Sequence, residues 1–474
     1  MITRDDLNAN VLSAEYAVRG PIVQRAQELE DEGRRIIYCN IGNPQALKQK
    51  PLSYIRQMLS LLEYPELLRH REVLRLIPED IVQRAMEILD RNPHGIGAYT
   101  QSTGIPFIRK AVADFISARD GIPANGDRVI LTDGASKGAQ AVMIALIRSR
   151  YDGFVIPVPQ YPLYSASIEL YGGRQIGYLL DEENQWQLNR EILAESIQRA
   201  EYDGIRPVCI VVINPGNPTG AVLSRDNAAM VIAFAREHRL GIIADEVYQE
   251  NIYDPGQRFH SFAKVMYEMG ETDVPLFSLH SVSKGFLGEC GHRGGYIEFR
   301  NISDDIWAEF SKLQSISLCA NTAGQIATYM MVSPPKPGDA SYETFVRERD
   351  GILGELKEKA EILGEGINQI EGMSVDVPKG AMYAFVKFDL PPEKGASRMT
   401  AAERLASDAR RDTHYCLALL EETGICVVPG SGFGQQPGTL HFRTTFLPPK
   451  DEINVLVQKL RAFHEHYVRE LADV

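Results

Sequence analysis

The sequence predicts an α/β protein whose large domain has a mostly parallel sheet between helices and whose smaller domain is α+β. Short apolar runs alternate with helical patterns from about residue 95 to 335. Strands separated by helices of this length form parallel sheets that are covered on both faces. The proline-rich segment 333–339 then ends the alternation, as expected at a domain junction. The chain of 474 residues is long enough for two such domains.

The first 60 residues carry one expected helix, 22–32, and one expected short strand, 36–41. This is too little to fold alone, so we expect residues 1–60 to join the smaller domain. The large domain is then expected over 61–340 and the smaller one over 341–474.

Apolar runs with the length of buried strands recur through the large domain. The expected strands are 128–131, 154–158, 208–213, 240–244, 276–279 and 295–299, and the clearest helices between them are 136–149 and 225–238. After the proline-rich break we expect a long charged helix over about 342–369, then shorter strands and a final helix over 450–471. Ligands of open parallel sheets bind beyond the carboxyl ends of the strands, which directs attention to the residues after each apolar run.

Composition excludes several classes of function. The formal charge of −13 argues against a nucleic-acid partner. No apolar run approaches the roughly 18 residues of a membrane span, and residues 1–6 show no signal-peptide pattern. Six scattered cysteines without a Cys-x-x-Cys pair disfavour a metal site or a disulfide framework and suit free thiols in the cytoplasm.

Lys284 lies in the most informative run of the chain, between Ser281 and Arg293. A lysine amine can form a Schiff base with an aldehyde cofactor such as pyridoxal 5'-phosphate. Ser281 and Arg293 could hold the phosphate of that cofactor, the arginine through two parallel hydrogen bonds. A solvated loop lysine is the alternative interpretation of this run alone.

Asp245 ends an apolar run, where a buried carboxylate could keep the pyridine nitrogen of the cofactor protonated. An aspartate that caps a helix is the alternative. Tyr248 and Asn217 also follow apolar runs and could hold the phenolic oxygen of the cofactor. The Pro/Gly/Asn cluster around Asn217 is equally typical of a turn.

Five further residues, in three separate segments, suit the same cofactor and its substrate. Gly134, Ala135 and Ser136 follow a strand and open a helix, where backbone amides can bind a phosphate. Tyr161, in a proline-rich loop, could stack on the ring or simply pack. Arg443, in a mostly apolar strand, could clamp a substrate carboxylate or form a structural salt bridge.

The order and joint presence of these motifs resemble the class I/II aminotransferases of fold type I along nearly the whole chain. Five segments are similar to those of the alanine aminotransferase group within this family: 39–45, 159–164, 213–220, 288–295 and 424–434. The resemblance implies pyridoxal 5'-phosphate as cofactor and transfer of the amino group of L-alanine to 2-oxoglutarate, giving pyruvate and L-glutamate.

The resemblance also implies a role for each residue. Lys284 would form the Schiff base and shuttle the proton, with Asp245 on the pyridinium and Tyr161 on the ring face. Asn217 and Tyr248 would hold the phenolic oxygen of the cofactor. The phosphate would be bound by Gly134, Ala135, Ser136, Ser281 and Arg293. Arg443, together with Gly42 and Asn217, would bind the substrate. Tyr99 matches a tyrosine that reaches the phosphate of the neighbouring subunit, which implies a homodimer with shared active sites.

Two departures bear on the substrate. Aspartate aminotransferases lend an arginine across the dimer to the second carboxylate of the substrate. The corresponding segment 315–322 has none, which disfavours aspartate as the donor and leaves open which residue binds the distal carboxylate of 2-oxoglutarate. Arg19 is one candidate. The interval from Lys284 to Arg293 is one residue longer than in aspartate aminotransferases, as in the alanine group. Another small or neutral donor, or a lyase on the same scaffold, remains an alternative.

Overall fold

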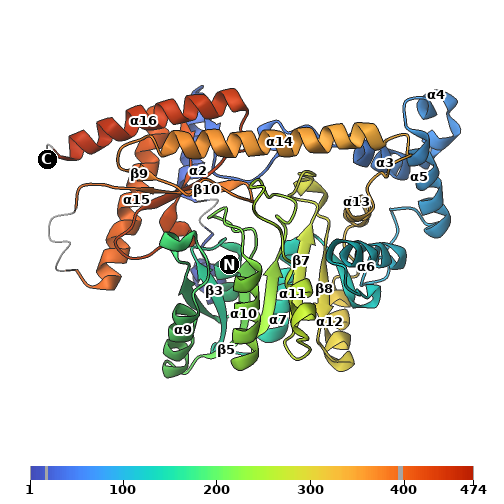
Figure 1. Ribbon diagram of the computed structural model, residues 1–474, viewed down its shortest axis with the longest axis horizontal. Coiled ribbons are helices and arrows are strands. Elements are labelled where there is room, and N and C mark those ends of the chain that lie inside the picture. Colours follow the sequence, from blue (N-terminus) through green and yellow to red (C-terminus); the bar gives the residue numbers. More distant parts are fainter. Residues whose placement is uncertain (1, 17–19, 393–398, 473–474) are drawn as a thin grey trace.

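A computed structural model describes residues 2–16, 20–392 and 399–472. A central sheet with its helices forms the lower part of the molecule in Figure 1, and α14 (Tyr342–Ile367) and α16 (Lys450–Ala472) run side by side above it. The upper part also contains a small antiparallel sheet. The predicted fold class, a mostly parallel sheet between helices with a smaller α+β part, is confirmed.

The central sheet has seven strands in the order β2-β8-β7-β6-β5-β3-β4. Their bounds are Val129–Thr132 (β2), Asp152–Val158 (β3), Arg174–Leu179 (β4), Arg206–Ile213 (β5), Gly241–Asp245 (β6), Leu276–Ser281 (β7) and Gly295–Arg300 (β8). Strand β8 pairs antiparallel with both of its neighbours, β2 and β7, whereas the pairs among β3 to β7 are parallel. Strand β4 was not predicted, because it lies at the sheet edge and its side chains alternate between exposed and buried positions.

Successive side chains of the central strands serve two different cores, since a strand points neighbouring residues to opposite faces. Ile210 and Ile242 pack with α9 (Arg190–Tyr202), α10 (Arg225–Glu237) and α11 (Phe262–Met269) on one face. Val211 and Ile243 pack on the other face with α7 (Ala135–Leu146), α8 (Leu163–Leu170) and α12 (Asp304–Ile316). Burial on both faces explains why these strands appear in the sequence as continuous apolar runs.

The small sheet has the order β12-β13-β10-β9 and is antiparallel. Its strands are Met373–Ser374 (β9), Tyr383–Phe388 (β10), Val428–Pro429 (β12) and His441–Thr445 (β13). Helices α14, α15 (Ala401–Thr423) and α16 cover it. The N-terminal α2 (Pro21–Asp31) and β1 (Ile37–Tyr38) share its hydrophobic core, and β1 pairs in parallel with β11 (Ile425–Cys426).

The remaining helices extend the large body. One core beside the sheet is shared by α3 (Ser53–Glu63), α5 (Glu79–Arg91), α6 (Pro106–Asp120) and α13 (Thr322–Val332). The short helix α4 (Arg71–Leu74) lies between α3 and α5 in the sequence, and α1 (Ala9–Ser13) belongs to the N-terminal segment. Phe345 of α14 packs into this core, whereas Leu363 of the same helix packs into the core of the small sheet. Helix α14 therefore belongs to both bodies. In the part of the chain that the structure describes, no helix has the length and apolar character needed to cross a membrane.

Candidate active site

A cavity of about 830 Å³ opens at the carboxyl ends of the central strands, between the sheet and the small domain. Most of the predicted site residues line it: Gly42, Ala135, Ser136, Tyr161, Asn217, Asp245, Tyr248, Ser281, Lys284, Arg293 and Arg443. The outermost of these residues, Gly42 and Arg443, are 401 positions apart, so the fold brings together what the sequence shows only as separate motifs. Gly134 lies immediately beside the cavity, and Tyr99 lies elsewhere on the same chain.

Lys284 follows β7 in the loop that leads to β8. Its side chain is half-buried, and its Nζ donates a hydrogen bond of 2.6 Å to the carbonyl oxygen of Gly42. The ring of Tyr248 lies beside it, with its centroid 6.0 Å from Nζ. The amine therefore lies inside the cavity rather than in solvent, which does not fit the alternative of a solvated loop lysine.

Asp245 is the last residue of β6 and is buried. Its Oδ2 accepts a 2.7 Å hydrogen bond from the hydroxyl of Tyr164, while its Oδ1 has no hydrogen-bond partner among the described residues. Burial raises the pKa of Asp245, and the Tyr164 hydroxyl, the Val247 amide and the charge of Lys284 lower it in part. No helix starts at this position, so the helix-cap interpretation is wrong. A buried carboxylate oxygen without a partner fits the protonated ring nitrogen of pyridoxal phosphate.

Arg443, on β13, is 1% exposed and lies between two aromatic rings. Its guanidinium carbon is 4.3 Å from the ring centroid of Tyr383 and 4.6 Å from that of Phe433. Its Nη1 donates to Oδ1 of Asn217 at 3.1 Å and its Nη2 to the carbonyl oxygen of Asn40. Its Nε has no partner, and no described carboxylate forms an ion pair with it. A fixed, buried guanidinium with unused donors fits a carboxylate ligand better than a structural salt bridge.

The expected phosphate site surrounds the start of α7. Gly134 precedes this helix with a φ of 79°, and a side chain there would place Cβ 2.5 Å from Nη2 of Arg293. Arg293 is held by two carbonyl oxygens, that of Asp133 at 3.0 Å and that of Cys290 at 2.9 Å. Ser136 opens the same helix and Ser281 ends β7. The helix amides, the hydroxyls and the arginine together fit a phosphate dianion.

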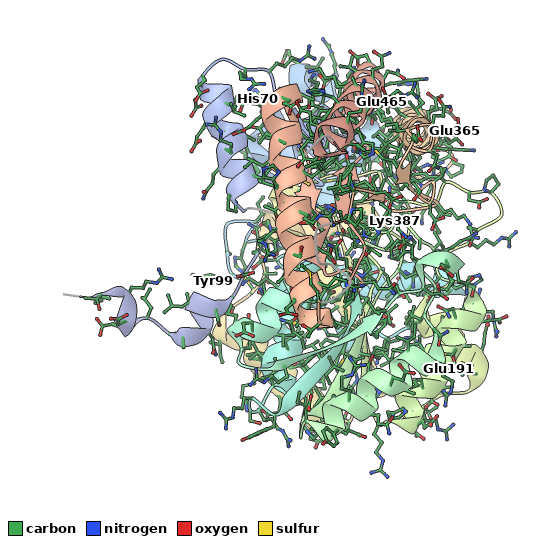
Figure 2. The ribbon with its side chains drawn as sticks, turned by 90° about the vertical axis from the view of Figure 1, so that its left-hand side faces the viewer. His70, Tyr99, Glu191, Glu365, Lys387 and Glu465 are labelled. Carbon is green, nitrogen blue, oxygen red and sulfur yellow. The ribbon has the colours of Figure 1, made fainter. Side chains whose placement is uncertain are left out.

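The aromatic candidates lie in different surroundings. The hydroxyl of Tyr161 is 2.7 Å from that of Tyr16, and burial raises the pKa of Tyr161 well above its usual range. Tyr99 is 80% exposed and lies on the surface, outside the cavity of its own chain (Figure 2). Arg19, the candidate for the distal carboxylate, lies outside the described residues.

Several residues of the site were not predicted. They are Tyr16, Gln45, Arg56, Tyr164, Glu289, His292 and Tyr383. Tyr164 could have been found, since it follows Tyr161 at helical spacing and would then face the same side. Tyr383 could not, because it lies in an apolar strand of the small sheet and only the packing of that sheet brings its ring against Arg443.

Comparisons with known proteins agree with this geometry. The family model "Aminotransferase class I and II" matches residues 69–460. The chain is 46% identical to the probable mitochondrial alanine aminotransferase of Dictyostelium discoideum, over 99% of this chain and 90% of that protein. It is 44% identical to glutamate–glyoxylate aminotransferase 2 of Arabidopsis thaliana, over 99% of this chain and 97% of that protein. It is 46% identical to an inactive alanine aminotransferase of Saccharomyces cerevisiae, over 98% of this chain and 94% of that protein. The solved alanine aminotransferase of Pyrococcus furiosus has a TM-score of 0.78 at 26% identity, covering 97% of this chain and all of that one.

Proposed function

The chain belongs to the class I and II aminotransferases, and we propose that it transfers the amino group of L-alanine to 2-oxoglutarate, giving pyruvate and L-glutamate. Its cofactor is pyridoxal 5'-phosphate, as in that family. The observation that carries the proposal is that Lys284, the unpartnered Oδ1 of Asp245 and the unused donors of Arg443 all lie at one cavity. Relatives that are named alanine aminotransferases support alanine as the donor.

When bound, the cofactor supplies an aldehyde that condenses with amines and a ring that accepts electrons from the α-carbon of the substrate. Asp245 would keep the ring nitrogen protonated through its free oxygen. Asn217 and Tyr248 would hold the phenolic oxygen, and the start of α7 with Ser281 and Arg293 would hold the phosphate.

The substrate would be held by its α-carboxylate on Arg443, whose guanidinium is already fixed between Tyr383 and Phe433. Lys284, whose Nζ lies inside the cavity, would act as the base that takes the proton from the α-carbon of the substrate and as the acid that gives it back. The carbonyl oxygen of Gly42, 2.6 Å from Nζ of Lys284, holds this amine inside the cavity.

The chemistry of the cavity is also compatible with a second donor–acceptor pair. A relative that is named glutamate–glyoxylate aminotransferase is nearly as similar as the alanine enzymes, which favours glyoxylate as an additional acceptor. A lyase on the same scaffold would use the same cofactor residues and would turn over an amino acid without any keto acid.

We also infer a homodimer with shared active sites. Tyr99 is exposed and outside its own cavity, as expected for a residue that serves a neighbouring subunit. The N-terminal segment projects from the body in Figure 2 and exposes apolar side chains such as Leu7 and Val11. Sedimentation velocity tests the dimer. Activity recovered on mixing Tyr99→Ala and Lys284→Ala chains would show that the sites are shared, and a monomeric active enzyme would contradict the inference.

The test of function is spectroscopic. The visible absorption of the cofactor-loaded protein is recorded, and L-alanine is added without a keto acid. We expect the yellow band to bleach and 2-oxoglutarate to restore it. Because one relative at 46% identity is named inactive, similarity alone does not guarantee this result. If L-alanine leaves the band unchanged while another amino acid bleaches it, the family and the cofactor stand and the proposed donor is wrong.

A further inference from the structure

The proposed acceptor, 2-oxoglutarate, carries a second carboxylate that alanine and pyruvate lack. The proposed function assigns Lys284, Arg293 and Arg443 to the amine, the phosphate and the α-carboxylate. Among the described residues that line the cavity, two other side chains can carry a positive charge, Arg56 and His292.

Arg56 and His292 are held together by one buried carboxylate. Glu289, whose side chain is 1% exposed, accepts from Arg56 Nε at 3.1 Å and from Arg56 Nη2 at 3.0 Å. The same carboxylate lies 2.8 Å from Nδ1 of His292. Gln45 joins them, because its Oε1 accepts from Arg56 Nη2 at 2.7 Å. We call these four residues, Gln45, Arg56, Glu289 and His292, the Glu289 cluster.

The Glu289 cluster has donors without acceptors. Nε2 of Gln45 is buried and has no hydrogen-bond partner among the described residues. No described residue accepts a hydrogen bond from Nη1 of Arg56. A buried donor without a partner is costly, so its presence at a cavity indicates a ligand that supplies an acceptor.

We infer that the Glu289 cluster is the subsite for the distal carboxylate of the dicarboxylic substrates, 2-oxoglutarate and L-glutamate, an inference that rests on the proposed function. An ionised carboxylate only accepts hydrogen bonds, and Arg56 and Gln45 offer only donors at this point. Glu289 offsets one positive charge of the cluster. The donors that stay free in the cluster, Nε2 of Gln45 and Nη1 of Arg56, are groups from which a carboxylate can accept hydrogen bonds.

Alanine and pyruvate have a single carboxylate, which the proposed function places on Arg443. The Glu289 cluster would therefore discriminate between the two substrate pairs that share the site. It would also explain how the chain can bind a dicarboxylate without an arginine in segment 315–322.

The test compares Arg56→Gln with a matched control, Arg206→Gln. Arg206 is also a half-exposed arginine that grips a buried carboxylate, that of Asp152, but it lies outside the cavity. The alanine and glutamate half-reactions are followed separately by the cofactor spectrum, and glutarate and butyrate binding to the holoenzyme are measured by calorimetry.

In Arg56→Gln we expect kcat/KM for L-glutamate to fall by about 10- to 100-fold, as for the loss of a charged hydrogen-bond partner, and glutarate binding to weaken in parallel. The kcat/KM for L-alanine and the affinity for butyrate should stay within about threefold of wild type. Arg206→Gln should change neither the two kcat/KM values nor the affinities for glutarate and butyrate. Equal losses for both amino acids, or no loss for glutamate, would overturn the inference. In the second case Arg19→Gln would show whether the sequence-based candidate binds the distal carboxylate instead.

Gln45→Ala provides a second variant that leaves the Arg56–Glu289 pair intact, in case Arg56→Gln does not fold. We expect kcat/KM for L-glutamate and the affinity for glutarate to fall by a few-fold, with no change for L-alanine or butyrate. An unchanged affinity for both would contradict the subsite. If the wild-type enzyme does not accept L-alanine, the proposed function fails, but the glutamate and glutarate measurements still decide the role of the Glu289 cluster.

Discussion

Replacing Tyr164 by phenylalanine would test how the protein controls the charge of Asp245. Tyr164 lies on α8 with no exposed surface, and its hydroxyl donates a 2.7 Å hydrogen bond to Oδ2 of Asp245. The substitution keeps the ring and removes only the hydroxyl, so packing changes little. It removes a 2.7 Å hydrogen bond to a buried carboxylate, which disfavours the ionised form that the cofactor ring needs.

The expected size of the effect of Tyr164→Phe follows from the loss of this one hydrogen bond. A hydrogen bond to a charged group contributes about 1.5–3 kcal/mol, which corresponds to roughly 10- to 100-fold in a rate or binding constant. We therefore expect Tyr164→Phe to weaken cofactor binding and lower kcat within that range. The pKa of Asp245, already raised by burial, should rise further because a donor that lowers it is lost. The acid limb of the kcat–pH profile should consequently move to higher pH.

Tyr178→Phe is the matched control, because Tyr178 is also buried and its hydroxyl donates at 2.9 Å to the carbonyl oxygen of Val211, away from Asp245. We expect it to cost about 1 kcal/mol of stability without moving the acid limb. The assays are cofactor dissociation measured by absorbance, kcat over a range of pH, and thermal unfolding. An acid limb that stays in place in Tyr164→Phe, or that moves equally in Tyr178→Phe, would refute the reasoning.

Three other variants test separate parts of the molecule. Lys284→Ala should abolish transamination while circular dichroism and Tm stay near those of wild type, and substantial turnover would remove Lys284 from its role. Arg443→Lys should raise KM for alanine by at least about tenfold, because an ammonium cannot form the two parallel bonds of a guanidinium, whereas an unchanged KM would exclude the carboxylate clamp. Burial raises the pKa of Glu246 from 4.5 to about 8, although Arg119 and the Phe262 amide partly oppose this. Between these pH values the folded state holds a proton that the unfolded state has lost, so stability falls as pH rises. Glu246→Gln should flatten that slope in calorimetric Tm measurements, and an unchanged slope would place the titration elsewhere.

The residues expected to bind the cofactor could be predicted because they follow apolar runs. Asp245 ends β6 and Lys284 follows β7, and the carboxyl ends of neighbouring parallel strands meet at one edge of a sheet. Hydrophobic pattern and strand order therefore place these side chains close together before any tertiary detail is known. Arg443 could be singled out for another reason, since a charged residue in an apolar strand needs a ligand or a partner.

The contacts around these residues could not be predicted in the same way. Arg56 meets Glu289 across 233 positions, and neither lies at the end of a strand. Arg56 lies on the exposed side of the amphipathic helix α3 and Glu289 lies in a glycine-rich loop, so nothing local distinguishes them from solvated charges. The edge strand β4 escaped prediction because exposure at the sheet edge removes the continuous apolar run.

The residues that could be predicted include those assigned to the cofactor and to the α-carboxylate, which all substrates of the reaction share, whereas the residues of the Glu289 cluster could not be predicted. Side chains at the strand ends would serve any reaction on the same cofactor, which is consistent with an alanine aminotransferase and a glutamate–glyoxylate aminotransferase being almost equally similar to this chain. The choice of substrate depends instead on side chains that reach the cavity from η3 (Gln45–Leu47), α3 and the loop after β7, where the Glu289 cluster lies. A change there alters which carboxylates are bound without altering the cofactor site. Substrate preference in this protein is therefore best resolved by variants of the Glu289 cluster rather than by overall similarity.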